Sequence, residues 1–209
     1  MKRHEHKNTE ADILSRPDLR RIAELIEPGS RVLDLGCGSG EFLRYLAASK
    51  QVEPLGVELD AGRVDECVRN GIPVIHGDLN SPLDYLEDKS FDCVLLTRTL
   101  QELLHPENLL REVTRIGRRG LVGFINFGHI RNRMQLFFTG KMPHGRNLPH
   151  AWYNTPNIHL GTIRDFRMLC EELNLEIIRT FPIGSDRGWL DMYLPNLLAH
   201  ACIFEIREK

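Results

Sequence analysis

The stretch VLDLGCGSGEF, Val32 to Phe42, joins an expected buried strand to an expected helix through a glycine-rich turn. An apolar run ends at Asp34, glycine then occupies every second position, and a helical pattern begins at Glu41. A turn of this kind brings backbone N–H groups close to a ligand at the carboxyl edge of a parallel sheet. The alternative interpretation is a tight turn in which glycine serves the backbone geometry alone.

The spacing of Gly36, Gly38 and Gly40 favours one class of ligand over two others. A dinucleotide-binding turn reads GxGxxG, and its third glycine position here holds Glu41, whose carboxylate opposes a diphosphate. A phosphate-binding P-loop needs GK[ST], which does not follow the turn. S-adenosylmethionine (SAM) has no phosphate, and its sulfonium and amino groups favour nearby carboxylates, so it fits the turn better than a nicotinamide dinucleotide.

Strand and helix patterns alternate on both sides of this turn. Expected strands and helices follow one another from residue 31 to residue 126, and the strand at 91–98 is almost continuously apolar. Such an order predicts an open, mostly parallel sheet with helices on both faces. Ser15 and Asp18 predict a capping box for a helix over 15–27, and Thr162 predicts the start of another at 163. Further strands are expected at 176–183 and 200–207.

Residues 127–161 interrupt the alternation with glycine, proline, histidine and aromatic residues. Long irregular stretches inside a compact domain are usually functional or disordered, and the aromatic content favours order. The insert is locally basic and suits a carboxylate substrate or an acidic partner, or it is a solvated charged loop. We therefore expect a flexible N-terminal segment at 1–14 and one domain at 15–209, with an irregular insert at about 127–161.

Composition limits the classes of partner and location. The 209 residues carry 27 basic and 29 acidic side chains, a balance that argues against broad binding to nucleic acid or to an anionic membrane. The N-terminus lacks the apolar core of a signal peptide, and no run is apolar enough to cross a bilayer. The five cysteines include no CxxC pair, so we expect reduced thiols in a cytoplasmic protein and no metal site.

Two further carboxylates support a nucleoside-bearing ligand. Glu58 ends the second expected strand, where an acid can accept both ribose hydroxyls, although a strand-end acid is often merely solvated. Asp78 follows the third strand and can accept the adenine amino group, whereas its structural alternative is a turn-forming aspartate. The glycine turn, Glu58 and Asp78 occur in the expected order, each at the carboxyl end of a strand, and that joint pattern is specific.

These residues lead to a resemblance. VLDLGCGSG, GVELD, GDLN and FDCVLLTRTLQEL resemble the successive motifs of class I SAM-dependent methyltransferases over about residues 30–126. NGIPVIHGDLN, TLQEL, NFGHIRNRMQLFFTGKMP and WYNTPNIHLGTIRDF are similar to the MetW family of methionine biosynthesis proteins, over most of the chain. The stretch GRNLPHAWY is more basic and richer in histidine than we expect of that family.

The resemblance implies a Rossmann-like, three-layer α/β/α fold with a seven-stranded, mostly parallel sheet whose last strand is antiparallel. It implies SAM, or its product S-adenosylhomocysteine, as ligand, with the glycines at the methionine part, Glu58 at the ribose, Asp78 and Leu79 at the adenine, and Leu96 and Thr97 at the sulfonium. The expected cofactor-binding residues are Asp34, Gly36, Cys37, Gly38, Gly40, Glu58, Leu59, Asp78, Leu79, Leu96 and Thr97.

The same resemblance implies support or regulation of a homoserine O-acyltransferase of the MetX type, as its partner. The alternative function is methyl transfer to a small molecule, which needs orientation and, for a protonated nucleophile, a general base. No catalytic signature identifies that base, so whether the protein is an enzyme stays open. The candidates are His159, Tyr153, His129 and Gln101.

Overall fold

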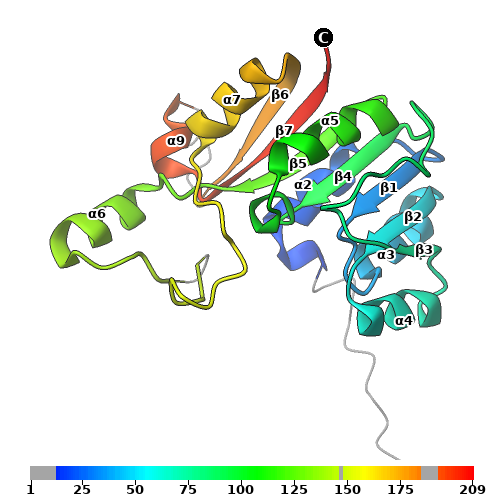
Figure 1. Cartoon of the computed structure of the whole chain (residues 1–209), viewed down its shortest axis with the longest axis horizontal. Helices are drawn as coiled ribbons and strands as arrows, with labels where there is room; N and C mark the ends of the chain where they lie inside the picture. The colour runs from blue at the N-terminus through cyan, green and yellow to red at the C-terminus, as the bar shows by residue number, and fades with distance from the viewer. Residues whose placement is uncertain (1–12, 146–147, 185–192) are drawn as a thin grey trace, which may run out of the picture.

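The computed structural model describes residues 13–145, 148–184 and 193–209, and these residues form a seven-stranded sheet flanked by helices (Figure 1). The predicted flexible segment 1–14 therefore lies outside the described residues up to position 12. The strands are β1 (Arg31–Leu35), β2 (Glu53–Glu58), β3 (Val74–His76), β4 (Cys93–Thr97), β5 (Gly120–Ile125), β6 (Leu175–Ile183) and β7 (Ala201–Glu208). The helices are α2 (Pro17–Leu25), α3 (Glu41–Lys50), α4 (Ala61–Arg69), the short 3-10 helix η1 (Leu100–Glu102), α5 (Pro106–Ile116), α6 (Ile130–Thr139), α7 (Ile163–Glu172) and α9 (Pro195–Leu198).

The order of strands across the sheet is β3-β2-β1-β4-β5-β7-β6. Strands β1 to β5 pair in parallel, whereas β7 runs antiparallel between β5 and β6. The carboxyl ends of β1, β2 and β4 consequently meet at one edge, where the order reverses between β1 and β4. The predicted Rossmann-like methyltransferase fold, with its last strand antiparallel, is confirmed.

Apolar side chains on both faces of the sheet produce the three layers. Leu33 and Leu35 of β1 belong to the apolar cluster that includes residues of α5 and α7, whereas Val32 of the same strand belongs to the cluster that includes residues of α2 and α3. This alternation follows from the two-residue period of a strand, and it explains why β4 is apolar at successive positions. Asp34 shares the face of Val32, so its side chain belongs to the layer covered by α2 and α3.

The two predicted helix caps have different outcomes. Thr162 and Asp165 form a capping box at the start of α7, as predicted for Thr162. The predicted box at Ser15 and Asp18 is wrong, because the N-cap of α2 is Arg16, which makes no side-chain capping bond. The Asp18 carboxylate binds Arg16 at 2.8 Å and Arg98 at 3.2 Å instead.

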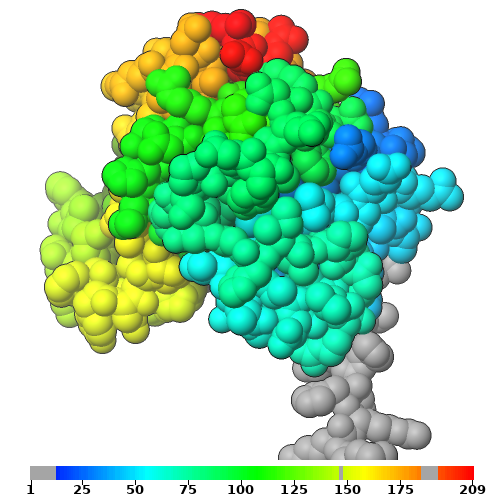
Figure 2. All heavy atoms as spheres, turned by 45° about the vertical axis from the view of Figure 1, so that its right-hand side comes forward, coloured from blue at the N-terminus to red at the C-terminus, as the bar shows by residue number. Residues whose placement is uncertain are grey.

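The segment expected to be irregular contains the ten-residue helix α6. His129 caps its start by accepting a hydrogen bond from the Arg131 N–H, and Gly140 ends it with a φ of 63°. The helix lies apart from the sheet and its covering helices, and together with the following segment it forms a lobe beside the body (Figures 1 and 2). No helix within the described ranges is long and apolar enough to cross a membrane.

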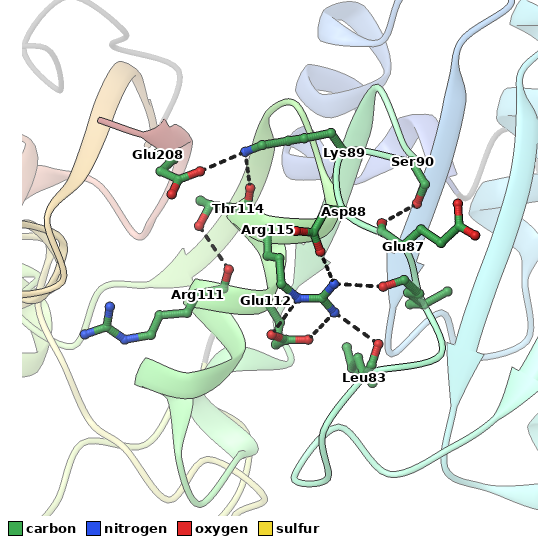
Figure 3. A network of polar contacts seen from close by, with 11 residues as sticks. Leu83, Glu87, Asp88, Lys89, Ser90, Arg111, Glu112, Thr114, Arg115 and Glu208 are labelled. Carbon is green, nitrogen blue, oxygen red and sulfur yellow. Dashed lines mark hydrogen bonds and ion pairs between the residues drawn. The ribbon is translucent and has the colours of Figure 1, made fainter.

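Arg115 of α5 holds the connection between β3 and β4 (Figure 3). Its guanidinium donates to the Leu83 carbonyl at 3.1 Å and the Leu86 carbonyl at 2.8 Å, and it binds the Asp88 and Glu112 carboxylates. A single planar donor group thus satisfies several acceptors of a connection without regular structure.

Replacing Arg115 by methionine should lower the free energy of unfolding by about 2 kcal/mol, because partly buried carbonyls would lose their donor. The matched control is Arg111→Met on the same helix, whose exposed side chain points away from this network (Figure 3). Urea unfolding of both variants measures the difference. Equal stabilities would contradict the anchoring role.

Candidate functional site

The glycine turn after β1 divides into residues with different roles. Gly36 has a φ of +82°, and a Cβ there would lie 2.5 Å from the Thr99 Oγ1, so the fold itself requires glycine. Gly38 has a φ of +60°, but a Cβ there would meet no atom within 4 Å. The geometric interpretation therefore accounts for Gly36, whereas Gly38 lies against open space. That space is where a ligand could approach the main chain.

The space beside Gly38 is part of a cavity of about 280 Å³. The glycine turn, the end of β4 and the start of α2 enclose it. The lining residues are Ile13, Arg16, Leu19, Asp34, Gly36, Cys37, Gly38, Ser39, Glu41, Phe42, Thr97 and Arg98. Five of the predicted cofactor residues are among them: Asp34, Gly36, Cys37, Gly38 and Thr97. Since acids and arginines line one small cavity, it suits a ligand that carries both signs of charge.

Asp34 is the electrostatic centre of the cavity. Asp34 is only 3% exposed, and its Oδ1 has no hydrogen-bond partner among the described residues. Burial, and secondly the charge of Glu58, raise the pKa of Asp34 to about 7, whereas Arg16 acts in the opposite direction. An unpaired buried carboxylate is costly, so the site favours a cation or a hydrogen-bond donor from a ligand.

Glu58 at the end of β2 stabilises the glycine turn through a hydrogen bond. Its Oε2 accepts a hydrogen bond from the Gly38 N–H at 2.8 Å, and its Oε1 accepts from the Leu59 and Asp60 N–H groups at 3.0 Å each. A carboxylate offers about four acceptor positions, so one remains for a ribose hydroxyl. The predicted ribose contact stays a prediction, with the added finding that Glu58 also shapes the turn.

The residues expected at the adenine lie outside the cavity lining. Asp78 is exposed and accepts hydrogen bonds from Asn80 N–H and Asn80 Nδ2, which is the turn-forming role left open above. Leu79 is half-buried, whereas Leu59 is 60% exposed and follows β2 directly. The adenine contacts of Asp78 and Leu79, and the cofactor contact of Leu59, stay predictions. Leu96 is fully buried, beside Thr97, which does line the cavity.

The sequence patterns did not identify Arg16, Asp18 and Arg98, whose ion pairs hold the start of α2 beside the cavity. Arg98 has a φ of +63°, unusual for a residue other than glycine, and Asp18 binds both Arg98 and Arg16. Such strain persists where surrounding contacts fix it. The partners are separated by 80 residues, so no local pattern signals their contact. The one available hint was that Arg98 follows Leu96 and Thr97.

None of the catalytic candidates lines the cavity in the described part of the chain. Gln101 is buried, and its amide bonds to the Ile125 main chain and the His159 carbonyl. His129 is buried and stacks on His200 at 3.9 Å, and burial first, then His200, lowers the pKa of His129 to about 4. His159 and Tyr153 are exposed. Their catalytic roles stay predictions, and no group that could hold a metal ion occurs among the described residues.

Comparison with known proteins identifies a family. Residues 16–206 match the family described as methionine biosynthesis protein MetW. The chain is 34% identical over 192 residues to the bifunctional methionine biosynthesis protein MetXA/MetW of Rhodopirellula baltica. The aligned region covers 88% of this chain and 31% of that protein. The chain therefore spans less than a third of this relative.

Solved structures share the fold at low sequence identity. A SAM-dependent methyltransferase from Archaeoglobus fulgidus superimposes with a TM-score of 0.65 and 15% identity, covering 96% of this chain and 95% of that one. The magnesium protoporphyrin IX methyltransferase of Synechocystis PCC 6803, with bound S-adenosylhomocysteine, gives a TM-score of 0.61 and 15% identity, with coverages of 96% and 84%. At this identity the similarity establishes the fold.

The charge of Asp34 predicts a dependence of stability on pH. Its pKa is raised from 3.8 to about 7 on folding, so the folded state holds the proton more tightly, and stability is lost as pH rises between these values. Asp34→Asn should consequently be more stable than the wild type at pH 8, by on the order of 2 kcal/mol, because it removes an ionised buried group. Unfolding of both proteins from pH 4 to pH 8 measures the difference, which should shrink toward pH 4. A variant that is less stable at pH 8 would contradict the assignment.

Proposed function

The chain belongs to the MetW family of methionine biosynthesis proteins, and we propose that it binds SAM or S-adenosylhomocysteine and supports or regulates a homoserine O-acyltransferase of the MetX type. The proposal joins a ligand site, argued from geometry, to a partner, argued from the family and from a relative.

The Asp34 Oδ1, which has no hydrogen-bond partner in the described part of the chain, is the observation that carries the ligand assignment. The methionine tail of SAM is a zwitterion beside a positive sulfonium. Asp34 would accept hydrogen bonds from the ammonium, and Arg16, which also lines the cavity, has further guanidinium N–H groups that could bind the carboxylate. The open space at Gly38 admits the ligand, and Glu58 keeps one acceptor position for the ribose.

The partner assignment rests on the relative in which MetXA and MetW names are joined in one protein. Two domains joined in one chain are at a high effective concentration relative to each other, which favours their association. The five cysteines lie in described parts of the chain, are buried and form no disulfide, which supports the cytoplasmic location included in the proposal.

A second candidate function, methyl transfer to a small molecule, is favoured by the approach of the insert to the strand ends. The Ile158 and His159 N–H groups of the insert donate to the Gln101 carbonyl of η1 at 2.9 and 3.1 Å. Bound SAM would supply an electrophilic methyl group, and this chain would orient it and exclude water. Transfer of a labelled methyl group to a metabolite, lost on changing His159 or Tyr153 with SAM binding intact, would favour this function.

SAM binding at the turn is tested by a matched pair of glycine variants. Gly38→Ala and Gly71→Ala each place a Cβ at positive φ in open space, so each should lower stability by about 1 kcal/mol. Only Gly38→Ala places that Cβ against the proposed ligand, so calorimetry should find SAM binding weakened about tenfold or more in this variant alone. NAD is the control ligand. Unchanged SAM affinity in Gly38→Ala would contradict binding on the turn.

Support of the acyltransferase is tested with the purified partner from the same organism. Addition of this protein should change the rate of acyl transfer to homoserine, and SAM should alter that change because ligand and partner bind the same protein. Asp34→Asn is the control, since it should keep the fold but lose the response to SAM. An acyl-transfer rate that is the same with and without the protein would contradict the proposed role.

A further inference from the structure

Helix α6 exposes an apolar face with no partner in the described chain. Met134, Phe137 and Phe138 lie on one side of the helix by their spacing, and they are 43%, 80% and 71% exposed. The two phenylalanine rings pack edge-to-face at 5.1 Å. No residue of α6 is buried. We call this side of the helix, with the adjacent Arg131, the arm face.

Polar contacts hold the base of this helix in place. The Asn126 amide donates to the Ala199 carbonyl at 2.8 Å and accepts from the Gly128 N–H at 3.0 Å. Asn132 donates to the Phe127 carbonyl, and His129 stacks on His200. The fold thus fixes the root of α6 while leaving aromatic side chains in solvent. Clustered exposed apolar side chains of this kind mark interaction sites.

The surroundings of the arm face are positively charged. Residues 127–161 contain none of the 29 acidic residues of the chain. Among the described residues, no carboxylate forms an ion pair with Arg131, Arg133 or Lys141, whereas Arg115, Arg119 and Arg179 of the body all have such pairs. A hollow of about 490 Å³ beside α6 is also lined by Arg133, Arg164 and Arg167. A complementary surface would present carboxylates around an apolar patch.

We infer that the arm face is the docking surface for an acidic, apolar-centred patch on the homoserine O-acyltransferase. The inference rests on the proposed function and adds the surface that performs it. The exposed phenylalanines favour a protein over nucleic acid, because aromatic anchors in a desolvated centre give protein interfaces most of their affinity. A separate partner is favoured over a second copy, because a basic face on an acidic body of the same chain gives a head-to-tail contact that need not close.

The test measures binding of the full-length protein to the purified acyltransferase by calorimetry. The double variant Phe137→Ser with Phe138→Ser, and separately Arg131→Glu, should weaken binding about tenfold or more. Val68→Ser and Arg111→Glu are the controls, since they alter an exposed apolar and an exposed basic residue on other helices and should bind like the wild type. SAM affinity should stay unchanged in all variants, because none of these residues lines the cavity.

The possible outcomes separate this inference from the proposed function. Acyltransferase binding by the wild type but equally by the arm variants overturns the docking surface and leaves the proposed function intact. Failure of the wild type to bind overturns both. Arm variants that lose self-association in sedimentation, or lose binding to a tRNA pool, while still binding the acyltransferase, also overturn the inference in favour of a second copy or an RNA.

Discussion

The Asp34 carboxylate lies inside the protein at the end of β1, where desolvation penalises its charge. The surrounding donors are directed elsewhere: the Gly38 N–H binds Glu58, and the Gly36 and Cys37 N–H groups bind the Val57 carbonyl. Among the described residues, the turn therefore gives Asp34 no hydrogen bond, only Arg16 partly offsets its buried charge, and the space beside Gly38 is open. A site that lowers the stability of the free protein in this way is poised to gain from a cationic ligand.

The sheet was predictable because its signals are local. The apolar run of β4, the turn at Gly36 and the cap at Thr162 each depend on neighbouring residues, and parallel strands follow from their alternation with helices. The glycines of the turn have two different causes. Gly36 leaves room for the Thr99 side chain, whereas Gly38 borders open space. Sequence could find the turn but could not separate these two causes.

The remaining features depend on contacts between distant residues. Asp18 was expected to cap α2, but Arg98 meets it across 80 residues, and no periodicity encodes that contact. Helix α6 escaped prediction for a different reason. Met134, Phe137 and Phe138 do have helical spacing, but α6 is short, and glycine on both sides of it, with proline after it, indicated an irregular segment.

Thr99 and the adjoining helix η1 connect the glycine turn to the insert. Thr99 contacts the turn at Gly36, and two residues later the Gln101 carbonyl accepts hydrogen bonds from the Ile158 and His159 N–H groups of the insert. The Gln101 amide also binds Ile125, at the end of β5 and close to the root of α6. A ligand that displaced η1 would therefore displace the insert as well. Such a contact transmits information only if ligand and partner prefer the same conformation, and the coupling between them is then equal in both directions.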